Sequence, residues 1–238
     1  DELKNQLYLS VICHRIRDVF TPIRELVTRD IGGFIRACPE SYCIDDYLKY
    51  IGVALSDKDA NVRIEGVSQL TSLTKRHLTS DLKELLERHK NRVLFMTRDT
   101  NETVILYTID LVDCMKENDM ISSQEDELIF ELILDVSQSV GHRAFEYYAK
   151  WSLAHEENRF VSILQYLDQY AKDDTEIHHV SVFVLNAAGN VDDLLVEPYQ
   201  WLFDSDSIQQ TLLQQRKDYK LDSRSMQLLG ALVKSCLR

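Results

Sequence analysis

Two groups of residues in this chain could do chemistry, but neither has the spacing of a reaction centre. His178 and His179 are adjacent, so on a helix their rings point about 100° apart and need further ligands to hold a metal ion. Paired carboxylates such as Asp192-Asp193 lack the alternating oxygen ligands of a calcium loop and are typical of solvated faces or first helical turns. We expect no metal site, no cofactor and no catalytic residue.

Known catalytic motifs are also missing from the sequence. It contains no phosphate-binding Gly-rich loop, no His-Glu-x-x-His and no Gly-x-Ser-x-Gly. An α-helical enzyme would need polar groups with shifted pKa values that converge in a pocket. The cluster Tyr147-Tyr148-x2-Trp151 favours packing between helices over a ligand cage. We therefore expect a protein that is not an enzyme.

The basic run Arg88-His89-Lys90-Asn91-Arg92 is the strongest candidate for binding chemistry. On a helix, Arg88 and Arg92 share one face, while Lys90 lies across from them. Pattern alone leaves two interpretations open: a solvated helix surface, or a basic rim that receives an acidic or aromatic partner segment.

Composition indicates an all-α protein without disulfides. The 238 residues include only seven Gly and three Pro, which is few for a β-rich or loop-rich fold. The five cysteines include no Cys-x-x-Cys pair, which indicates reduced thiols in a cytosolic or nuclear protein. No apolar run is long enough to cross a membrane. The chain opens at Asp1 without Met, which predicts a fragment of something longer.

The net charge of −12 is unevenly distributed and bears on DNA binding. Residues 1–92 hold 15 Lys and Arg against 14 Asp and Glu, whereas residues 93–238 hold 12 against 25. An acidic second half repels a phosphate backbone. We expect at most weak DNA contact from the first half of the chain, through Lys75, Arg76, Lys83 and Lys90.

Apolar residues recur with a helical period nearly throughout. Thr21-Pro22 predicts an N-cap and first helical position, Cys38-Pro39 a helix end, and Ser122-Ser123 ahead of Glu125 a capped start. The expected helices cover residues 3–20, 22–37, 43–55, 59–75, 79–97, 101–117, 122–137, 141–153, 156–171, 174–188, 191–203, 205–217 and 222–237.

A weak internal repeat predicts how these helices stack. Ser56-Asp57-x4-Val62-Arg63-x3-Val67 is echoed 42 residues later by Arg98-Asp99-x4-Val104-Ile105-x3-Ile109, and more faintly from Val140. This period is typical of HEAT and armadillo repeats, whose helical hairpins stack into a solenoid. Val62, Ile64 or Val67, Leu70, Val104, Ile109 and Val112 are expected to include core positions.

The region from Val11 to Leu153 resembles a known family. The colinear motifs that carry the resemblance are His14-Arg15-Ile16-Arg17-Asp18, Ile23-Arg24, the stretch from Ile44 to Arg63, and Arg88-His89-Lys90-Asn91-Arg92-Val93-Leu94-Phe95-Met96-Thr97. Together they are similar to the stromalin conservative domain of cohesin stromal antigen subunits. We expect residues 1–155 to form repeats of this kind and 156–238 to continue the same solenoid.

The resemblance implies a surface that binds short aromatic peptide segments, partly together with the kleisin subunit. The matching positions are Arg17, Asp45, Lys49, Tyr50 and Arg88. The family usually has Trp where this chain has Val53, and Phe where it has His89. Losing these aromatic rings should weaken an aromatic anchor by about 1–3 kcal/mol. The departures indicate a divergent member, either specialised for meiosis or from a fast-evolving lineage.

The function implied is a non-enzymatic cohesin scaffold in the nucleus, associated with chromosomes. It would hold kleisin and the cohesin ring, bind regulatory peptides and help to place DNA for sister-chromatid cohesion, without contacting a membrane. The alternative is a generic HEAT or armadillo adaptor outside cohesin, for example in transport or phosphatase regulation. That class would share the repeat pattern but lack the blocks from Tyr47 to Arg63 and from Arg88 to Thr97.

Overall fold

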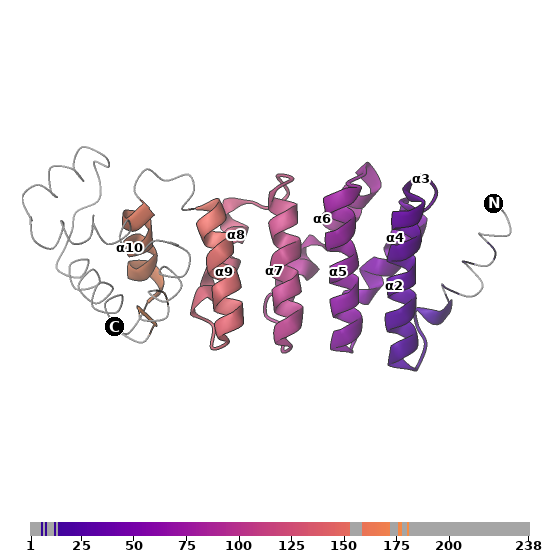
Figure 1. Ribbon diagram of the computed structural model, residues 1–238, viewed down its shortest axis with the longest axis horizontal. Coiled ribbons are helices and arrows are strands. Elements are labelled where there is room, and N and C mark those ends of the chain that lie inside the picture. Colours follow the sequence, from indigo (N-terminus) through magenta and orange to yellow (C-terminus); the bar gives the residue numbers. More distant parts are fainter. Residues whose placement is uncertain are drawn as a thin grey trace, which may run out of the picture. The chain divides into compact units, whose positions relative to one another are not determined.

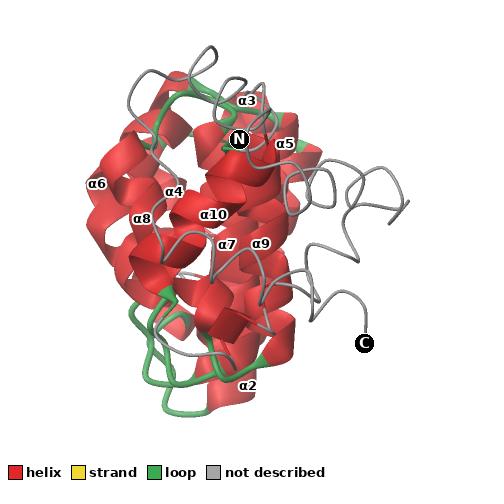
Figure 2. Cartoon of the chain, turned by 90° about the vertical axis from the view of Figure 1, so that its left-hand side faces the viewer, coloured by secondary structure: helices red, strands yellow, loops and turns green. Residues whose placement is uncertain are grey.

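A computed structural model describes residues 14–152 and 159–171, together with residues 6, 8, 12, 176, 177 and 180. The described residues are helical, and Figure 2 shows no strand among them. The elements are α2 (Thr21–Ala37), α3 (Pro39–Tyr42), α4 (Asp45–Ala54), α5 (Ala60–Arg76), α6 (Ser80–Met96), α7 (Glu102–Lys116), α8 (Ser123–Phe130), the 3₁₀ helix η2 (Glu131–Leu134), α9 (Gln138–Trp151) and α10 (Arg159–Tyr170).

The chain divides into two compact units, Asp1–Ile129 and Phe130–Arg238. This division, after Ile129, does not coincide with the boundary expected after residue 155, which was expected to separate two parts of one solenoid. Most of the expected second part lies outside the described residues, as do the helices expected at 174–188, 191–203, 205–217 and 222–237. That domain scheme therefore stays a prediction.

The first unit has two layers of helices. α5 packs against both α2 and α7 in one layer, while α4 and α6 pack against each other in the second (Figure 1). Chain order alternates between the layers, so consecutive long helices form hairpins, and each hairpin packs against the next. This arrangement confirms the expected all-α helical-repeat architecture.

The internal repeat corresponds to a recurring turn in front of the helices. Asp57 accepts a hydrogen bond from the amide of Asp59 at 2.8 Å, and Asp99 accepts one from Asn101 at 3.0 Å. The side chains of Asp59 and Asn101 then cap α5 and α7. Side-chain oxygens at these positions satisfy amides that have no partner within the helix.

The same turn occurs twice more and corrects two expected helix ends. Asp18 accepts from the amide of Phe20 at 2.9 Å, so the expected helix 3–20 gives way to a turn at Ile16. α2 begins at Thr21 with Phe20, not Thr21, in the N-cap position. Asp135 accepts from Ser137 at 2.8 Å with an extended backbone, which ends the helix expected at 122–137. These aspartates hold the chain in a turn that a helix cannot continue through.

Two buried arginine–aspartate pairs join successive repeats, and we call them the Arg–Asp ladder. Arg24 binds Asp57 through two hydrogen bonds of 2.7 and 2.8 Å, and also donates to the carbonyl of Asp18. Arg63 binds Asp99 at 2.8 and 2.7 Å and donates to the carbonyl of Asp57. Each arginine therefore holds the turn of its own repeat to the turn of the next.

Both ladder carboxyls have shifted pKa values. Burial alone would raise the pKa of Asp57 and Asp99, but hydrogen bonds from the arginines and from turn amides lower it below the ordinary value. The pairs are therefore ionised near neutral pH, and the folded state favours that ionisation.

The core lies between the two layers. Leu70, Val67, Val104, Ile109 and Val112 have no exposed surface, and Val62 is almost as deeply buried. These expected core positions are confirmed, and of the pair offered as alternatives the buried one is Val67, since Ile64 is only half-buried.

The second unit packs aromatic side chains around α9. Tyr147 and Tyr148 are buried, and Phe130 meets Tyr148 edge to face at 4.9 Å. The Tyr148 hydroxyl donates to the carbonyl of Ser162, and the Tyr166 hydroxyl donates to that of Phe130. Both hydroxyls thus have the partners that burial demands. The expected packing role of the Tyr147 cluster is confirmed.

Candidate functional site

The residues singled out for peptide binding lie mainly on α4 and α6. Asp45, Lys49, Tyr50 and Val53 belong to α4, and Arg88 and His89 to α6. Thr79 starts α6 by accepting a hydrogen bond from the amide of Leu82. We call these six α4 and α6 residues the α4–α6 surface.

Arg88 connects the two helices through an exposed ion pair. Its Nη1 lies 3.0 Å from Oδ1 of Asp45 on α4, and its Nη2 lies 3.1 Å from Oε1 of Glu84 one turn earlier on α6. The Arg88 and Asp45 side chains are 45% and 52% exposed. The bond to Glu84 and the charge of Asp45 raise the pKa of Arg88. An exposed guanidinium of this kind can exchange its partners for those of a ligand at little energetic cost.

His89 lies against the backbone of α4. A Cβ placed on Gly52 would approach the His89 Nε2 to 2.5 Å, so the imidazole occupies the space that a side chain at this position would fill. Burial, with the neighbouring Arg88 charge, lowers the pKa of His89 below its ordinary value of 6.5. The ring is thus neutral at pH 7 and presents one donor and one acceptor.

Lys49, Tyr50 and Val53 expose different chemistry beside this pair. The Lys49 ammonium binds Asp46 at 3.1 Å and lies 5.5 Å from the centre of the Tyr50 ring. Val53 is 43% exposed and offers a small apolar surface. The surface therefore combines two cations, a carboxylate and a phenol ring. Val53 and His89 add an aliphatic side chain and an imidazole at the two positions where the family resemblance implies larger aromatic side chains.

Arg17 stands apart from the α4–α6 surface in the described contacts. It is exposed in the turn ahead of α2, and no contact recorded among the described residues joins it to α4 or α6. Convergence of Arg17 with Asp45, Lys49, Tyr50 and Arg88 stays a prediction.

Arg92 and Phe95 extend this surface, although neither is among the positions that the family resemblance implied for peptide binding. Arg92 donates from Nε to the carbonyl of Leu55 at 3.0 Å, at the end of α4. Its guanidinium lies 5.7 Å from the centre of the Phe95 ring, which is 65% exposed. The shared face of Arg88 and Arg92 was the available signal, and the structure turns both toward α4.

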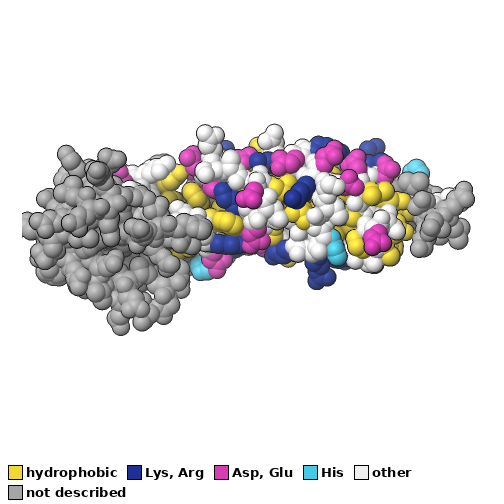
Figure 3. Space-filling view, turned by 90° about the horizontal axis from the view of Figure 1, so that it is seen from above, with side chains coloured by type: hydrophobic (Ala, Val, Ile, Leu, Met, Phe, Trp, Pro, Cys, Tyr) yellow, Lys and Arg dark blue, Asp and Glu magenta, His cyan; other side chains and the backbone are white. Residues whose placement is uncertain are grey.

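The residues expected to contact DNA are dispersed over α5 and α6. Lys75 and Arg76 are exposed at the end of α5, and Lys83 is exposed near the start of α6. Lys90 is instead paired with Glu125 at 2.8 Å and is mostly covered. On the face of the first unit seen in Figure 3, acidic and basic side chains are intermixed. That pattern does not favour strong attraction of a polyanion.

No group of three or more His, Cys, Asp or Glu residues that could hold a metal ion occurs among the described residues. No helix among them is both long and apolar enough to span a bilayer. His178 and His179 lie outside the described residues. Cys38, Cys43 and Cys114 are free thiols.

Stacked helical hairpins that expose a mixed polar and aromatic surface define a helical-repeat binding scaffold. The model of the stromalin conservative domain matches residues 17–90, which include the α4–α6 surface and Arg17. Over this region the chain is similar to the stromalin conservative domain found in cohesin stromal antigen subunits.

The relatives with which the chain aligns are distant in sequence. The chain is 28% identical to rat cohesin subunit SA-3 over 98% of its length, and 28% identical to Xenopus laevis cohesin subunit SA-1 over 63%. It spans only 19% and 12% of those relatives. The solved structure of cohesin subunit Scc3 from Z. rouxii shares the fold, with a TM-score of 0.67, 16% identity, and coverage of 99% of this chain and 30% of that one.

Proposed function

We propose that this chain is a segment of a cohesin subunit that acts as a non-enzymatic scaffold in the nucleus, on chromosomes. It binds kleisin and short regulatory peptide segments and helps to place DNA for sister-chromatid cohesion. The supporting observation is the exposed Arg88–Asp45 pair, which lies within the region matched by the stromalin conservative domain. The relatives with which it aligns are named as cohesin subunits, and none of those named above is named as an enzyme.

Recognition at the α4–α6 surface would work by exchange of charged partners. Arg88 has five N–H donors, and the structure records two of them in bonds to exposed carboxylates. A carboxylate or carbonyl of an incoming segment would replace Glu84 or Asp45 with little net desolvation. Lys49 and Tyr50 would border the segment, and Val53 and His89 would form a floor with less aromatic area than the family pattern.

The test measures peptide capture by the 238-residue chain with a kleisin segment present. The probe is a fluorescent peptide that contains an aromatic residue followed by acidic residues, and the readout is fluorescence anisotropy. Arg88→Glu should weaken capture by about tenfold or more, because it places a carboxylate beside Asp45 and Glu84 and removes the donor. Lys83→Glu is the matched control, since it makes the same charge change at an exposed position on the same helix.

Two further variants test the floor and the outlying arginine. Val53→Trp with His89→Phe should strengthen capture of an aromatic peptide by about tenfold, which corresponds to roughly 1.4 kcal/mol. Arg17→Glu should weaken it if Arg17 belongs to the same site. If Arg88→Glu and Arg17→Glu leave capture unchanged, and the double variant adds nothing, the α4–α6 surface is not the recognition surface of this protein.

A further inference from the structure

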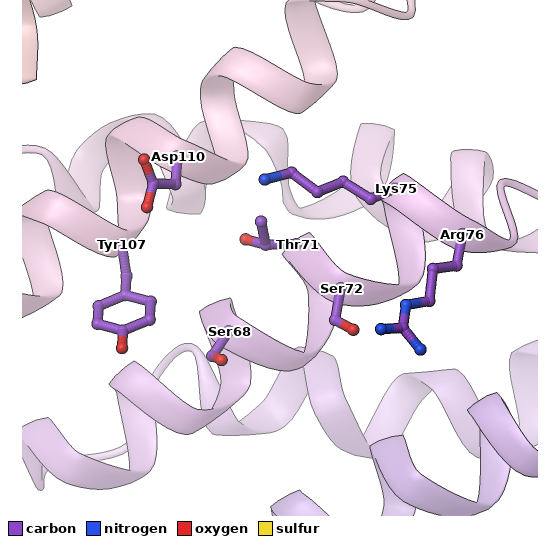
Figure 4. Close-up of a pocket in the computed structure, with 7 residues that line it drawn as sticks. All are labelled: Ser68, Thr71, Ser72, Lys75, Arg76, Tyr107 and Asp110. Carbon is purple, nitrogen blue, oxygen red and sulfur yellow. The ribbon is translucent and has the colours of Figure 1, made fainter.

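A pocket of about 270 Å³ lies between α5 and α7, and the proposed peptide surface does not use it (Figure 4). One stripe of the C-terminal half of α5 forms its main wall. The members of the stripe follow helical spacing, so their side chains share one face. They are Ser68, Thr71, Ser72, Lys75 and Arg76.

The two cations of this pocket, Lys75 and Arg76, are recorded in no ion pair among the described residues. By contrast, Lys90 binds Glu125 and Lys116 binds Asp126, both at 2.8 Å. Figure 4 shows the Lys75 ammonium on the side of Thr71 and the Arg76 guanidinium on the side of Ser72. A ligand between them would thus meet positive charge from two directions.

Hydroxyl groups lie on the same face of α5, one and two turns before these cations. Thr71 donates its hydroxyl proton to the carbonyl of Val67 at 2.9 Å. Within the described residues, no protein partner is recorded for the hydroxyls of Ser68 and Ser72, which are half-buried. Two cations with two available hydroxyl donors match a group with several negatively charged acceptor oxygens, and a phosphate is the common biological example.

A helix end alone does not explain this set of residues. Lys75 and Arg76 lie in the last turn of α5, where cations offset the negative end of the helix dipole. That effect accounts for their charge, but it does not account for the hydroxyls one and two turns earlier on the same face. The combination of charge and hydroxyl donors along the pocket wall therefore points to a ligand.

The opposite wall limits what that ligand can be. Tyr107 and Asp110 of α7 face the α5 stripe, and Tyr107 is 39% exposed. A carboxylate in the pocket repels a continuous polyanion such as duplex DNA, and the chain as a whole carries a charge of −12. A single phosphate whose neighbours offer amide or ammonium donors fits both walls, because those donors can face Asp110.

We propose that the α5–α7 pocket binds a phosphoserine or phosphothreonine side chain of a partner polypeptide. The phosphate lies between Lys75 and Arg76, and Ser68 and Ser72 donate hydrogen bonds to its oxygens. Asp110 faces a backbone amide or a basic side chain next to the phosphorylated residue. This site is separate from the α4–α6 surface, so its occupancy does not require the Arg88 interactions.

The experiment titrates the ¹⁵N-labelled 238-residue chain with N-acetyl-phosphoseryl-lysine amide and follows amide shifts of α5 by NMR. The expected result is saturable binding with the largest shifts at the hydroxyl-bearing stripe, and no comparable shifts with the unphosphorylated compound. Lys75→Ala with Arg76→Ala should weaken binding at least tenfold. Ser68→Ala with Ser72→Ala should weaken it severalfold while leaving the charge unchanged. All four residues are exposed or half-exposed, so the variants should keep the wild-type circular dichroism spectrum and melting temperature.

Matched controls separate this site from general charge attraction. Lys83→Ala removes an exposed cation elsewhere in the same unit and should leave the titration unchanged. Equal weakening by Lys83→Ala, or wild-type affinity in the Ser68→Ala with Ser72→Ala variant, would overturn the proposal. Inorganic phosphate that binds as tightly as the phosphoserine compound would overturn the assignment to a polypeptide. A 20-base-pair DNA duplex that shifts the same amides with higher affinity would assign the pocket to nucleic acid instead.

Discussion

Asp99→Ala removes the carboxylate of one buried pair of the Arg–Asp ladder and should strongly destabilise the first unit. The change leaves Arg63, whose side chain is 10% exposed, without the two hydrogen bonds of 2.8 and 2.7 Å. Only the Asp57 carbonyl then remains as a recorded acceptor. Charge-assisted hydrogen bonds contribute roughly 1.5–3 kcal/mol each. Removing one partner of a buried pair costs about 3–5 kcal/mol. We therefore expect a loss near 4 kcal/mol in the free energy of unfolding.

Urea unfolding followed by circular dichroism at 222 nm measures this loss, and hydrogen exchange of α5 and α7 amides localises it. The control is Asp45→Ala, which breaks a pair whose two side chains are 45% and 52% exposed. Exposed pairs contribute about 0–1 kcal/mol, so the control should shift the unfolding midpoint little. A loss below 1 kcal/mol for Asp99→Ala, or equal losses in the two variants, would refute the assignment of stability to the buried pair.

The stability difference between wild type and Asp99→Ala should also depend on pH. The pKa of Asp99 is lower in the folded state than its ordinary value, so the carboxylate contributes stability above the pKa of the unfolded chain, which is about 3.9. That contribution is lost as the pH falls through the lower, folded-state pKa. The difference in stability between wild type and Asp99→Ala should therefore be full at pH 6 and should shrink as the pH falls below about 4.

Three further predictions concern the core, the α4–α6 surface and DNA. Leu70→Ala should destabilise the chain by roughly 2–5 kcal/mol in urea unfolding, because Leu70 is fully buried, and a loss below 1 kcal/mol would place it outside the core. Gly52→Ala should displace the His89 ring and relieve its burial, so the His89 pKa measured by NMR titration should rise toward 6.5; an unchanged pKa would contradict the contact. The isolated chain should bind duplex DNA weakly and with a steep dependence on salt, and sub-micromolar affinity at physiological salt would contradict the charge argument.

Much of the fold was predictable because it depends on local pattern. Helical periodicity marked the long helices, and their expected ends at Cys38 and Ser122 are confirmed. At Ser122, the Glu125 carboxylate accepts hydrogen bonds from both the amide and the hydroxyl. The bond from the amide is one half of a capping box, whereas the Glu125 amide donates to the Ser122 carbonyl and not to its hydroxyl. The 42-residue echo from Asp57 to Asp99 located the repeated turn, because that turn depends on one aspartate and the amide two residues later.

The ladder was not predictable in the same way. Arg24 and Asp57 are 33 residues apart, and Arg63 and Asp99 are 36 apart, so no local spacing signals their pairing. Arg24 stood in a motif and Asp57 in a repeat, but only the stacking of hairpins places one beside the other. The bond from Arg92 to the Leu55 carbonyl was equally unpredictable, because every residue has a backbone carbonyl and the sequence does not show which one accepts.

The early stop at Asp135 shows where periodicity misleads. Apolar residues continue at helical spacing through the segment expected at 122–137, yet the chain tightens into η2 and leaves the helix at Leu134. A turn in which Asp135 accepts from the Ser137 amide replaces the continuing helix. This turn also lets the Ser137 hydroxyl oxygen cap α9 by accepting from the Val140 amide at 3.4 Å. Alignment of Asp135 with Asp57 and Asp99 was the signal that could have located this boundary.

Arginine has opposite roles in the two parts of the first unit. Arg63 is shielded from water and binds both the Asp99 carboxylate and the Asp57 carbonyl. Removing either partner would leave a buried charge with too few hydrogen bonds, so this arginine is suited to holding repeats together. Arg88 forms longer bonds of 3.0 and 3.1 Å at an exposed position, so those bonds add little stability and can be replaced. Repeats held rigidly by buried pairs would keep the exposed arginine in a fixed place. A preorganised donor loses less entropy when a partner binds, which is why a scaffold of this kind can recognise short segments with few contacts.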